Sequence, residues 1–133
     1  MFSQTVEYAL RAVVCLATDP KRLQGASEIA ETMDVPAGYL VKVMQQLVKA
    51  DIVVSKRGKG GGFLLNRPAE KISLLDVINA VDPIKRINEC PLSLEAHCEQ
   101  LCPLHAKLDA SYAQMEETFK DCNVSEMIDV KKS

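Results

Sequence analysis

A short segment rich in cysteine is the first candidate for chemistry in this chain. Cys90 and Cys98 are separated by seven residues, Cys98 and Cys102 by three, and His105 follows after two more. Thiolates are the ligands of iron–sulfur clusters, and a histidine can complete the set. An odd, clustered set of cysteines in a cytosolic chain favours metal binding or redox chemistry over a disulfide framework. The segment is therefore predicted to bind a metal or to be redox-active.

The position of Cys102 favours a reactive thiolate. It precedes Pro103 at the predicted start of a helix, where backbone N–H groups and the helix dipole stabilise negative charge. His105, on the first turn of that helix, could bind the same metal. The residues leave three interpretations open: an iron–sulfur cluster, a thiol–disulfide switch, and zinc or structural cysteine. Of the other cysteines, Cys15 is interpreted as a small buried hydrophobe, and Cys122 as a candidate intersubunit or resolving thiol.

The composition is that of an ordinary globular protein, but its charge is unevenly distributed. No run approaches the roughly 18 apolar residues of a membrane span, and the N-terminus lacks the basic region of a secretory signal. The predicted location is therefore the cytoplasm, with no membrane partner. The net charge is −2, yet residues 35–67 carry six Lys and Arg against one Asp, a net of +5. This block could meet a phosphate backbone locally, and a solvated basic face is the alternative.

Apolar spacing predicts three helices before the cysteine segment begins. They cover residues 3–18, residues 27–33 with Ser27 as the cap, and residues 36–50 with Pro36 in the first turn. Two helices joined by a short turn, of which the second is basic, form a helix-turn-helix pattern. The side chains predicted to face the core are Val6, Ala9, Leu10, Val13, Ala17, Ile29, Met33, Leu40, Val43, Met44, Leu47 and Val48.

A β-hairpin is predicted directly after the helix-turn-helix. Two apolar β-type runs, 52–55 and 63–65, flank a turn that contains four glycines and the cations Lys56, Arg57 and Lys59. A hairpin in this position is a wing, and its tip is positively charged. A phosphate-binding nucleotide loop is the alternative, but the turn lacks the strand–loop–helix context and the Gly-Lys-Ser/Thr ending of such a loop.

The remaining residues predict a connecting loop and a long helix. Ser73 begins a short helix that ends near Pro83, and residues 84–101 lack periodicity. From Cys102 an apolar stripe runs along a helix of about twenty residues, longer than the winged domain can cover, so it is predicted to form a dimer contact. The stripe consists of Leu104, Leu108, Tyr112, Met115 and Phe119. The predicted fold is mainly α with a small β-hairpin wing. Its parts are a winged helix-turn-helix domain (1–83), a cysteine-bearing sensor loop (84–102) and a dimerisation helix with its tail (103–133).

The order and spacing of these motifs resemble a known family. The run SEIAETMDVPAGYLVKVMQQLVKADIVVSKRGKGGGFLLNRP (27–68) resembles the winged-helix core of the Rrf-two family, the IscR/NsrR-type bacterial regulators. The segments YALRAVVCLAT (8–18) and ISLLDVINAVD (72–82) fit as well. The resemblance implies a homodimer that places one recognition helix per subunit in successive major grooves of a roughly palindromic operator.

The resemblance also assigns residues to DNA. Gly38, Tyr39, Val41 and Lys42 lie at the start of the reading helix, and Arg57 is the wing cation, flanked by Lys56 and Lys59. Some relatives have a serine in place of Gly38 and a glutamate in place of Val41. Valine offers only apolar contact, for example to a thymine methyl group. We therefore expect an operator preference different from that of those relatives.

For the cysteines, the resemblance implies a [2Fe–2S] or [4Fe–4S] cluster. In cluster-binding members, three loop cysteines act with a histidine shortly after the last one, or with an acidic residue on the first helix of the partner subunit. Here His105 fits the first arrangement and Glu7 the second. Those relatives space their cysteines more evenly than this chain does, which favours Cys90 and Cys102 over Cys98 as ligands. Some members bind no cluster and act through partner proteins or thiol chemistry.

The predicted function is a DNA-binding transcriptional regulator, with repression as the family default. Its operator binding would be controlled by an iron–sulfur cluster or by redox-active cysteines. A thiol switch without a cluster is the alternative. An iron–sulfur carrier would explain the cysteines but neither the helix-turn-helix nor the wing. An enzyme is not expected, because two histidines and no hydrolase motif provide little for a catalytic set.

Overall fold

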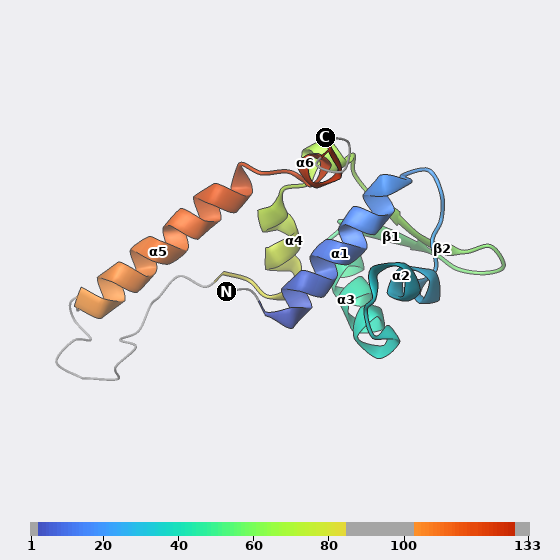
Figure 1. Cartoon of the computed structure of the whole chain (residues 1–133), viewed down its shortest axis with the longest axis horizontal. Coiled ribbons are helices and arrows are strands. Elements are labelled where there is room, and N and C mark those ends of the chain that lie inside the picture. Colours follow the sequence, from blue (N-terminus) through green and yellow to red (C-terminus); the bar gives the residue numbers. More distant parts are fainter. Residues whose placement is uncertain (1–2, 85–102, 130–133) are drawn as a thin grey trace.

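The computed structural model describes residues 3–84 and 103–129, and Figure 1 shows their arrangement. The predicted ligands Cys90, Cys98 and Cys102 lie outside these residues. The described chain is mainly helical with one antiparallel hairpin, as predicted. Its elements are α1 (Gln4–Thr18), α2 (Ala26–Met33), α3 (Ala37–Lys49), β1 (Val53–Lys56), β2 (Gly62–Leu65), the 3-10 helix η1 (Ala69–Lys71), α4 (Leu74–Val81), α5 (Pro103–Lys120) and α6 (Val124–Asp129).

The helix-turn-helix consists of α2 and α3. Asp34 ends α2 in the left-handed conformation (φ 55°), and its N–H donates to the Ala30 carbonyl. The prediction that Ser27 caps α2 is wrong. The helix begins at Ala26, and Gly25 occupies the cap position in extended backbone with no side-chain hydrogen bond. Gln24, the residue before Gly25, pairs with the wing and is therefore extended, so the helix can begin only after this pair.

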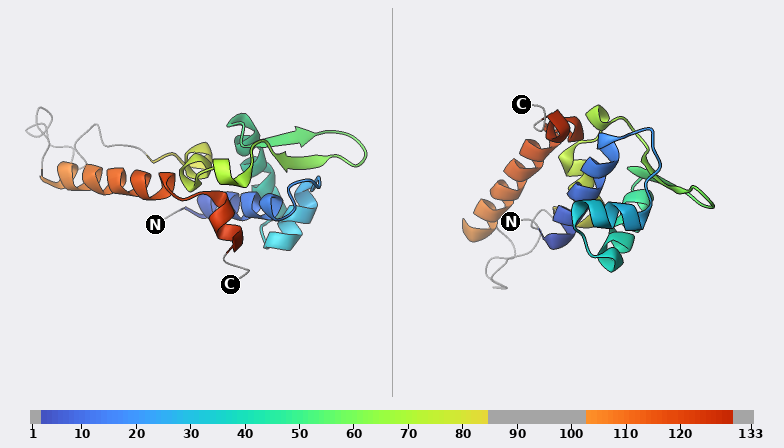
Figure 2. Two further views of the ribbon diagram at one scale, coloured as in Figure 1. Left: turned by 90° about the horizontal axis from the view of Figure 1, so that it is seen from above. Right: turned by 45° about the vertical axis from the view of Figure 1, so that its right-hand side comes forward.

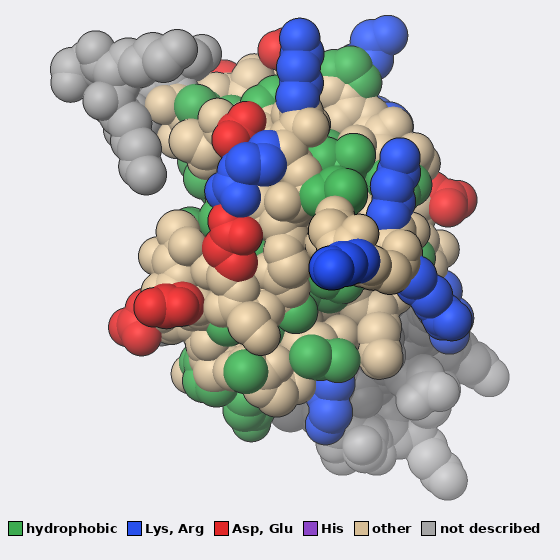
Figure 3. Space-filling model, turned by 90° about the vertical axis from the view of Figure 1, so that its right-hand side faces the viewer, with side chains coloured by type: hydrophobic (Ala, Val, Ile, Leu, Met, Phe, Trp, Pro, Cys, Tyr) green, Lys and Arg blue, Asp and Glu red, His purple; other side chains and the backbone are tan. Residues whose placement is uncertain are grey.

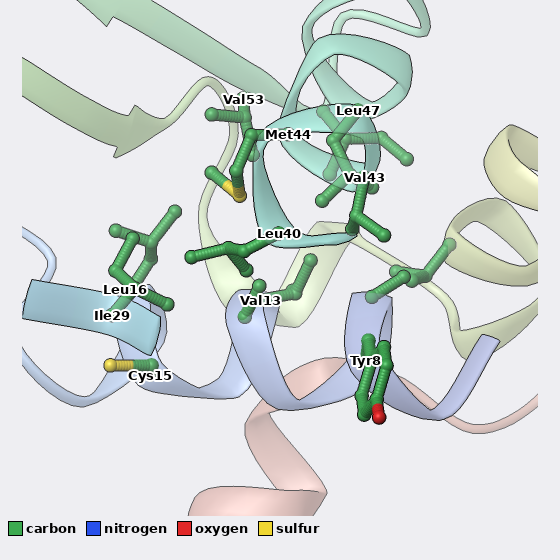
Figure 4. Close-up of a cluster of buried hydrophobic side chains, with 14 of the residues drawn as sticks. Tyr8, Val13, Cys15, Leu16, Ile29, Leu40, Val43, Met44, Leu47 and Val53 are labelled. Carbon is green, nitrogen blue, oxygen red and sulfur yellow. The ribbon is translucent and has the colours of Figure 1, made fainter. Parts of the chain in front are cut away.

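The core is formed where α1 and α3 cross, with α2 and β1 at its sides (Figure 4). Leu40, Met44 and Leu47 recur at helical spacing along α3 and are fully buried, which confirms the predicted inward face of that helix. They pack against α1, where Val13 and Leu16 are equally buried. Because this face of α3 is fixed in the core, the opposite face is held rigidly toward solvent.

The wing is a two-stranded antiparallel hairpin. Its register runs from Val53 opposite Leu65 to Lys56 opposite Gly62, one residue longer toward the tip than the sequence predicted. Gly58 and Gly60 have φ of 100° and 78°, a region that side chains with a Cβ atom rarely adopt. The predicted glycine-dependent turn is therefore confirmed.

Gln24 attaches the wing to α1, a role that the sequence did not reveal. Its N–H donates to the Phe63 carbonyl (3.2 Å), and the Phe63 N–H donates to the Gln24 carbonyl (2.9 Å). The side chain of Gln24 is only 3% exposed. Its amide Nε2 donates to the Cys15 carbonyl (3.2 Å), and the Cys15 thiol donates to its Oε1 (3.3 Å). The buried thiol thus helps to fix the wing on the helical core.

The C-terminal helices α5 and α6 join the winged unit, which consists of the elements from α1 to α4, through a short backbone pairing. The Leu74 N–H donates to the Cys122 carbonyl (2.8 Å), and the Val124 N–H donates to the Ile72 carbonyl (2.9 Å). Ser73 between them forms the predicted helix cap of α4, as part of a full capping box with Asp76. The sequence predicted neither α6 nor η1.

Helix α5 extends away from the winged unit, and its N-terminal end lies farthest from the wing (Figures 1 and 2). Leu104 is 40% exposed, and Leu108, Tyr112, Met115 and Phe119 are half-buried. The predicted apolar stripe is thus only partly covered within this chain. Among the described residues, no helix combines the length and the apolar character needed to span a membrane.

Candidate nucleic-acid interface

The start of α3 presents the predicted reading residues to solvent. Gly38, Tyr39, Val41 and Lys42 are all exposed, while Leu40 between them is buried. Three large apolar side chains are exposed in the described part of the chain, and two of them are Tyr39 (53%) and Val41 (46%). Exposed apolar and aromatic groups next to a lysine are typical of a surface that meets a partner.

Tyr39 is held in place by the core below it. Its ring lies 5.8 Å from the ring of Tyr8, centroid to centroid, at an interplanar angle of 61°, which is an edge-to-face contact. The guanidinium of Arg11 lies 5.7 Å from the centroid of the Tyr8 ring. Tyr39 also lines a hollow of about 360 Å³ with Pro36, Gly38 and Lys42. The predicted residues of the helix start therefore share one small surface.

A groove of about 550 Å³ separates α3 from the wing. One wall belongs to α3 and includes Val41 and Gln45, and the other belongs to the hairpin and includes Ser55 and Arg57. Ala26, Val48 and Phe63 complete the lining. The structure thus brings the predicted reading residue Val41 and the predicted wing cation Arg57 to one groove. Figure 3 shows the face at the wing end, where Lys and Arg side chains surround patches of apolar atoms.

The wing cations point into solvent without carboxylate partners. Lys56, Arg57 and Lys59 are exposed, and none of them forms an ion pair within residues 3–84 and 103–129. Other arginines do have such partners: Arg22 lies 2.6 Å from a Glu28 carboxylate oxygen, and Arg67 lies 3.7 Å from one of Asp76. The positive charge of the wing therefore stays available for an external anion.

The two alternative fourth ligands are in different environments. His105, on the first turn of α5, is only 4% exposed, whereas Glu7, on the first turn of α1, is exposed. The starts of these two helices lie well apart in Figures 1 and 2, so one chain does not bring the two residues together. Within the described ranges, no group of three or more His, Cys, Asp or Glu is arranged to hold a metal ion.

Two residues of this surface were missed by sequence reasoning. Gln45 lines the groove one helical turn beyond Val41, and the spacing of four residues was a signal that could have found it. Tyr8, on α1, supports Tyr39 from a distant part of the chain. Tyr8 was not among the residues predicted to face the core, and its contact with Tyr39 is set by the tertiary packing.

Comparisons with known proteins agree with this architecture. The family model of Rrf2, described as an iron-dependent transcriptional regulator, matches residues 2–130. A curated protein of Aquifex aeolicus (strain VF5), named as an HTH-type transcriptional regulator, is 31% identical over 135 residues, which cover 99% of this chain and 94% of that protein.

Solved structures of other proteins share the fold, among them those of IscR and CymR. IscR of T. potens superposes with a TM-score of 0.80 at 20% identity, covering 98% of this chain and 88% of that one. CymR (YrzC), the global cysteine regulator of B. subtilis, superposes with a TM-score of 0.75 at 21% identity, covering 96% and 95%. The family match over nearly the whole length, together with the Aquifex relative, shows that this chain belongs to the Rrf2 family of transcriptional regulators.

Proposed function

We propose that the chain acts as a homodimer that binds a roughly palindromic operator, and that the segment 88–105 controls this binding through an iron–sulfur cluster or redox-active cysteines. DNA binding is supported above all by the groove between α3 and the wing. In this groove, exposed residues of α3 lie opposite wing cations that have no carboxylate partner among the described residues. The surface formed by α3 and the wing of one subunit is called a reading head. Two reading heads, one in each of two successive major grooves, would lie about 34 Å apart. Binding to chromosomal DNA places the protein in the cytoplasm.

The exposed stripe of α5 supports the dimer. Leu104, at its N-terminal end, is the third large apolar side chain exposed in the described residues. A helix that projects from its own domain with an incompletely covered apolar stripe buries that stripe best against a symmetry-related copy. The dimer would then fix the distance between the two reading heads.

The donor types in the sequence before α5, together with His105, fit an iron–sulfur cluster. Cys90, Cys98 and Cys102 provide thiolates, and His105, buried on the first turn of α5, provides an imidazole screened from water. Glu7 would be the fourth ligand only if it came from the partner subunit, since the starts of α1 and α5 are separate within one chain. A bound cluster would supply a centre whose occupancy or oxidation state can change. The iron-dependent description of the family supports this choice.

The backbone pairing at Ser73 provides a route from α5 to the reading heads. A displacement of α5 would be passed through Cys122 and Val124 to Ile72 and Leu74, which flank the Ser73 cap of α4. Asp76 in the first turn of α4 contacts Arg67, two residues after the end of β2. Rearrangement of the segment before α5 would in this way change the position of the wing and the spacing of the two heads.

A thiol switch without a cluster is the second candidate. It is favoured by the likeness to CymR, one structure of which is described as an oxidized form from Staphylococcus aureus, with a TM-score of 0.72 at 23% identity. In that case Cys90 and Cys102 would be the first residues to test, because Cys102 directly precedes α5, where a thiolate is stabilised.

The test is an ultraviolet–visible spectrum with iron and sulfide assays on protein purified without oxygen, combined with operator binding on the same samples. Absorption between about 320 and 420 nm with stoichiometric iron and sulfide is the result expected for a cluster sensor. Protein that stays colourless after anaerobic reconstitution would contradict the cluster and leave the thiol switch. Operator affinity that is the same with and without the cluster, and with oxidised and reduced thiols, would contradict both forms of control.

A further inference from the structure

Gln45 presents a side-chain amide on α3 that is available for a hydrogen bond to a partner. It is exposed, it lines the groove between α3 and the wing, and its amide forms no hydrogen bond within the described part of the chain. It lies four residues after Val41, so the two side chains project from the same face of α3.

The geometry of a helix in the major groove sets what Gln45 can reach. Four residues of α-helix advance by about 6 Å, and base pairs are stacked about 3.4 Å apart, so Gln45 would meet a base one or two pairs from the one that Val41 contacts. A carboxamide can donate to N7 and accept from N6 of adenine in one bidentate contact. Across the groove, Arg57 provides a cation for the phosphate strand that runs between helix and wing.

We propose that Gln45 is a further specificity-determining residue, which recognises an adenine in each half-site from the helix wall of this groove. The proposal rests on the proposed function, because it needs DNA to occupy the face that α3 and the wing form. The thymine methyl contact of Val41 and the adenine contact of Gln45 together predict two neighbouring A·T pairs in each half-site.

The chain contains a matched control for this residue. Gln46 has the same side chain on the same helix and is also exposed, but it does not line the groove. It is rotated by about 100° around the helix axis from Gln45. Replacement of either glutamine by alanine removes the same groups from an exposed helical position, so both variants should fold. Thermal unfolding followed by circular dichroism verifies this.

The experiment selects binding sites for the full-length chain from a randomised double-stranded DNA library. Each base pair of the selected site is then replaced in turn, and the affinities of wild type, Gln45→Ala and Gln46→Ala are compared. For wild type, replacing the recognised A·T pair should weaken binding about 10- to 100-fold. With Gln45→Ala this penalty should disappear while the penalties at other positions remain, and Gln46→Ala should behave as wild type.

A second variant tests the contact by gain of preference. A carboxylate accepts a hydrogen bond from N4 of cytosine, so Gln45→Glu should move the preference at that position from A·T to C·G. Unchanged base preferences in both Gln45 variants would overturn the proposal, as would an equal loss of affinity on every sequence. If wild type selects no sequence over random DNA, the proposed function fails, and the role of Gln45 fails with it.

Discussion

The ring of Tyr8 meets the ring of Tyr39 edge to face, with 5.8 Å between the centroids and 61° between the planes. Tyr8 is buried in α1, whereas Tyr39 is exposed at the start of α3. The contact therefore connects the core directly to the surface that is proposed to meet DNA. It limits the freedom of Tyr39 before any partner binds, which lowers the entropic cost of binding.

Replacing Tyr8 by leucine should affect both stability and DNA binding. The loss of the aromatic pair should lower the free energy of unfolding by about 1 kcal/mol. The freed Tyr39 side chain should weaken DNA binding by about 2- to 5-fold. Tyr8→Phe keeps the ring and should change neither quantity beyond about half of these effects. Urea unfolding and fluorescence anisotropy measure the two effects, and a leucine variant equal to wild type in DNA affinity would show that the contact does not prepare Tyr39.

The attachment of the wing depends on the absence of a side chain at Gly62. A Cβ atom there would lie 2.8 Å from the backbone of Gln24, too close for the pairing between Gln24 and Phe63 to persist unchanged. Gly62→Ala should therefore destabilise the fold by about 1–3 kcal/mol, as overpacked positions do. It should also weaken DNA binding, because the wing moves.

Gly25 provides the comparison for this variant. A Cβ atom at Gly25 would meet nothing within 4 Å, so Gly25→Ala tests the loss of a glycine without a clash. The expected cost at this helix cap position is only about 0.5 kcal/mol. Denaturant unfolding compares the two, and equal costs would mean that the close approach at Gly62 does not matter for the wing.

Operator preference should depend on Val41. The side chain is 46% exposed on the reading face, and it can contact a thymine methyl group but cannot accept a hydrogen bond. Val41→Glu should shift the preferred base pair towards C·G by about 1–3 kcal/mol, since a carboxylate accepts from N4 of cytosine. Site selection with both proteins measures this shift. If both select the same sequence, Val41 does not contribute to base recognition.

The thiol of Cys122 should react slowly with alkylating reagents. Burial raises the pKa of Cys122, and the hydrogen bond and negative charge of Glu126 raise it further. The thiolate therefore forms only at a pH above that of an ordinary cysteine, and the folded state retains the proton longer than the unfolded chain does. Alkylation by iodoacetamide, followed by mass spectrometry between about pH 7 and 10, should show a midpoint above that of an unfolded control peptide. A midpoint below the control would contradict this expectation and favour Cys122 as an intersubunit or resolving thiol.

The sequence predicted those parts of the fold that depend on local patterns. The inward face of α3, the glycine turn of the wing and the Ser73 cap each depend on residues within a few positions of one another. The start of α2 was predicted too late, because the extended chain ends at Gln24, whose backbone pairs with Phe63 far along the sequence, and the helix begins directly after Gly25. No local pattern reveals such a pairing.

In the candidate site, too, the sequence predicted what depends on local patterns and not what depends on tertiary contacts. Val41 and Arg57 could be named from the helix-turn-helix and wing patterns, but only the tertiary structure shows that they line one groove with Gln45. The α6 helix was missed for a similar reason: Val124 is buried because its backbone pairs with Ile72. The cysteine ligands stay a prediction, since Cys90, Cys98 and Cys102 lie outside the described residues.

DNA binding through α3 and the wing is tested by the salt dependence of operator affinity for wild type and Arg57→Ala, with the absorption spectrum recorded on the same samples. The variant should bind about tenfold more weakly at 0.1 M salt, its salt slope should fall by about one, and its spectrum should be unchanged. Lys71→Ala, which removes an equal charge from η1 outside the groove, should bind as wild type. If Arg57→Ala leaves affinity and salt slope unchanged, the wing does not meet DNA, and α3 and the wing do not form the proposed DNA-binding surface.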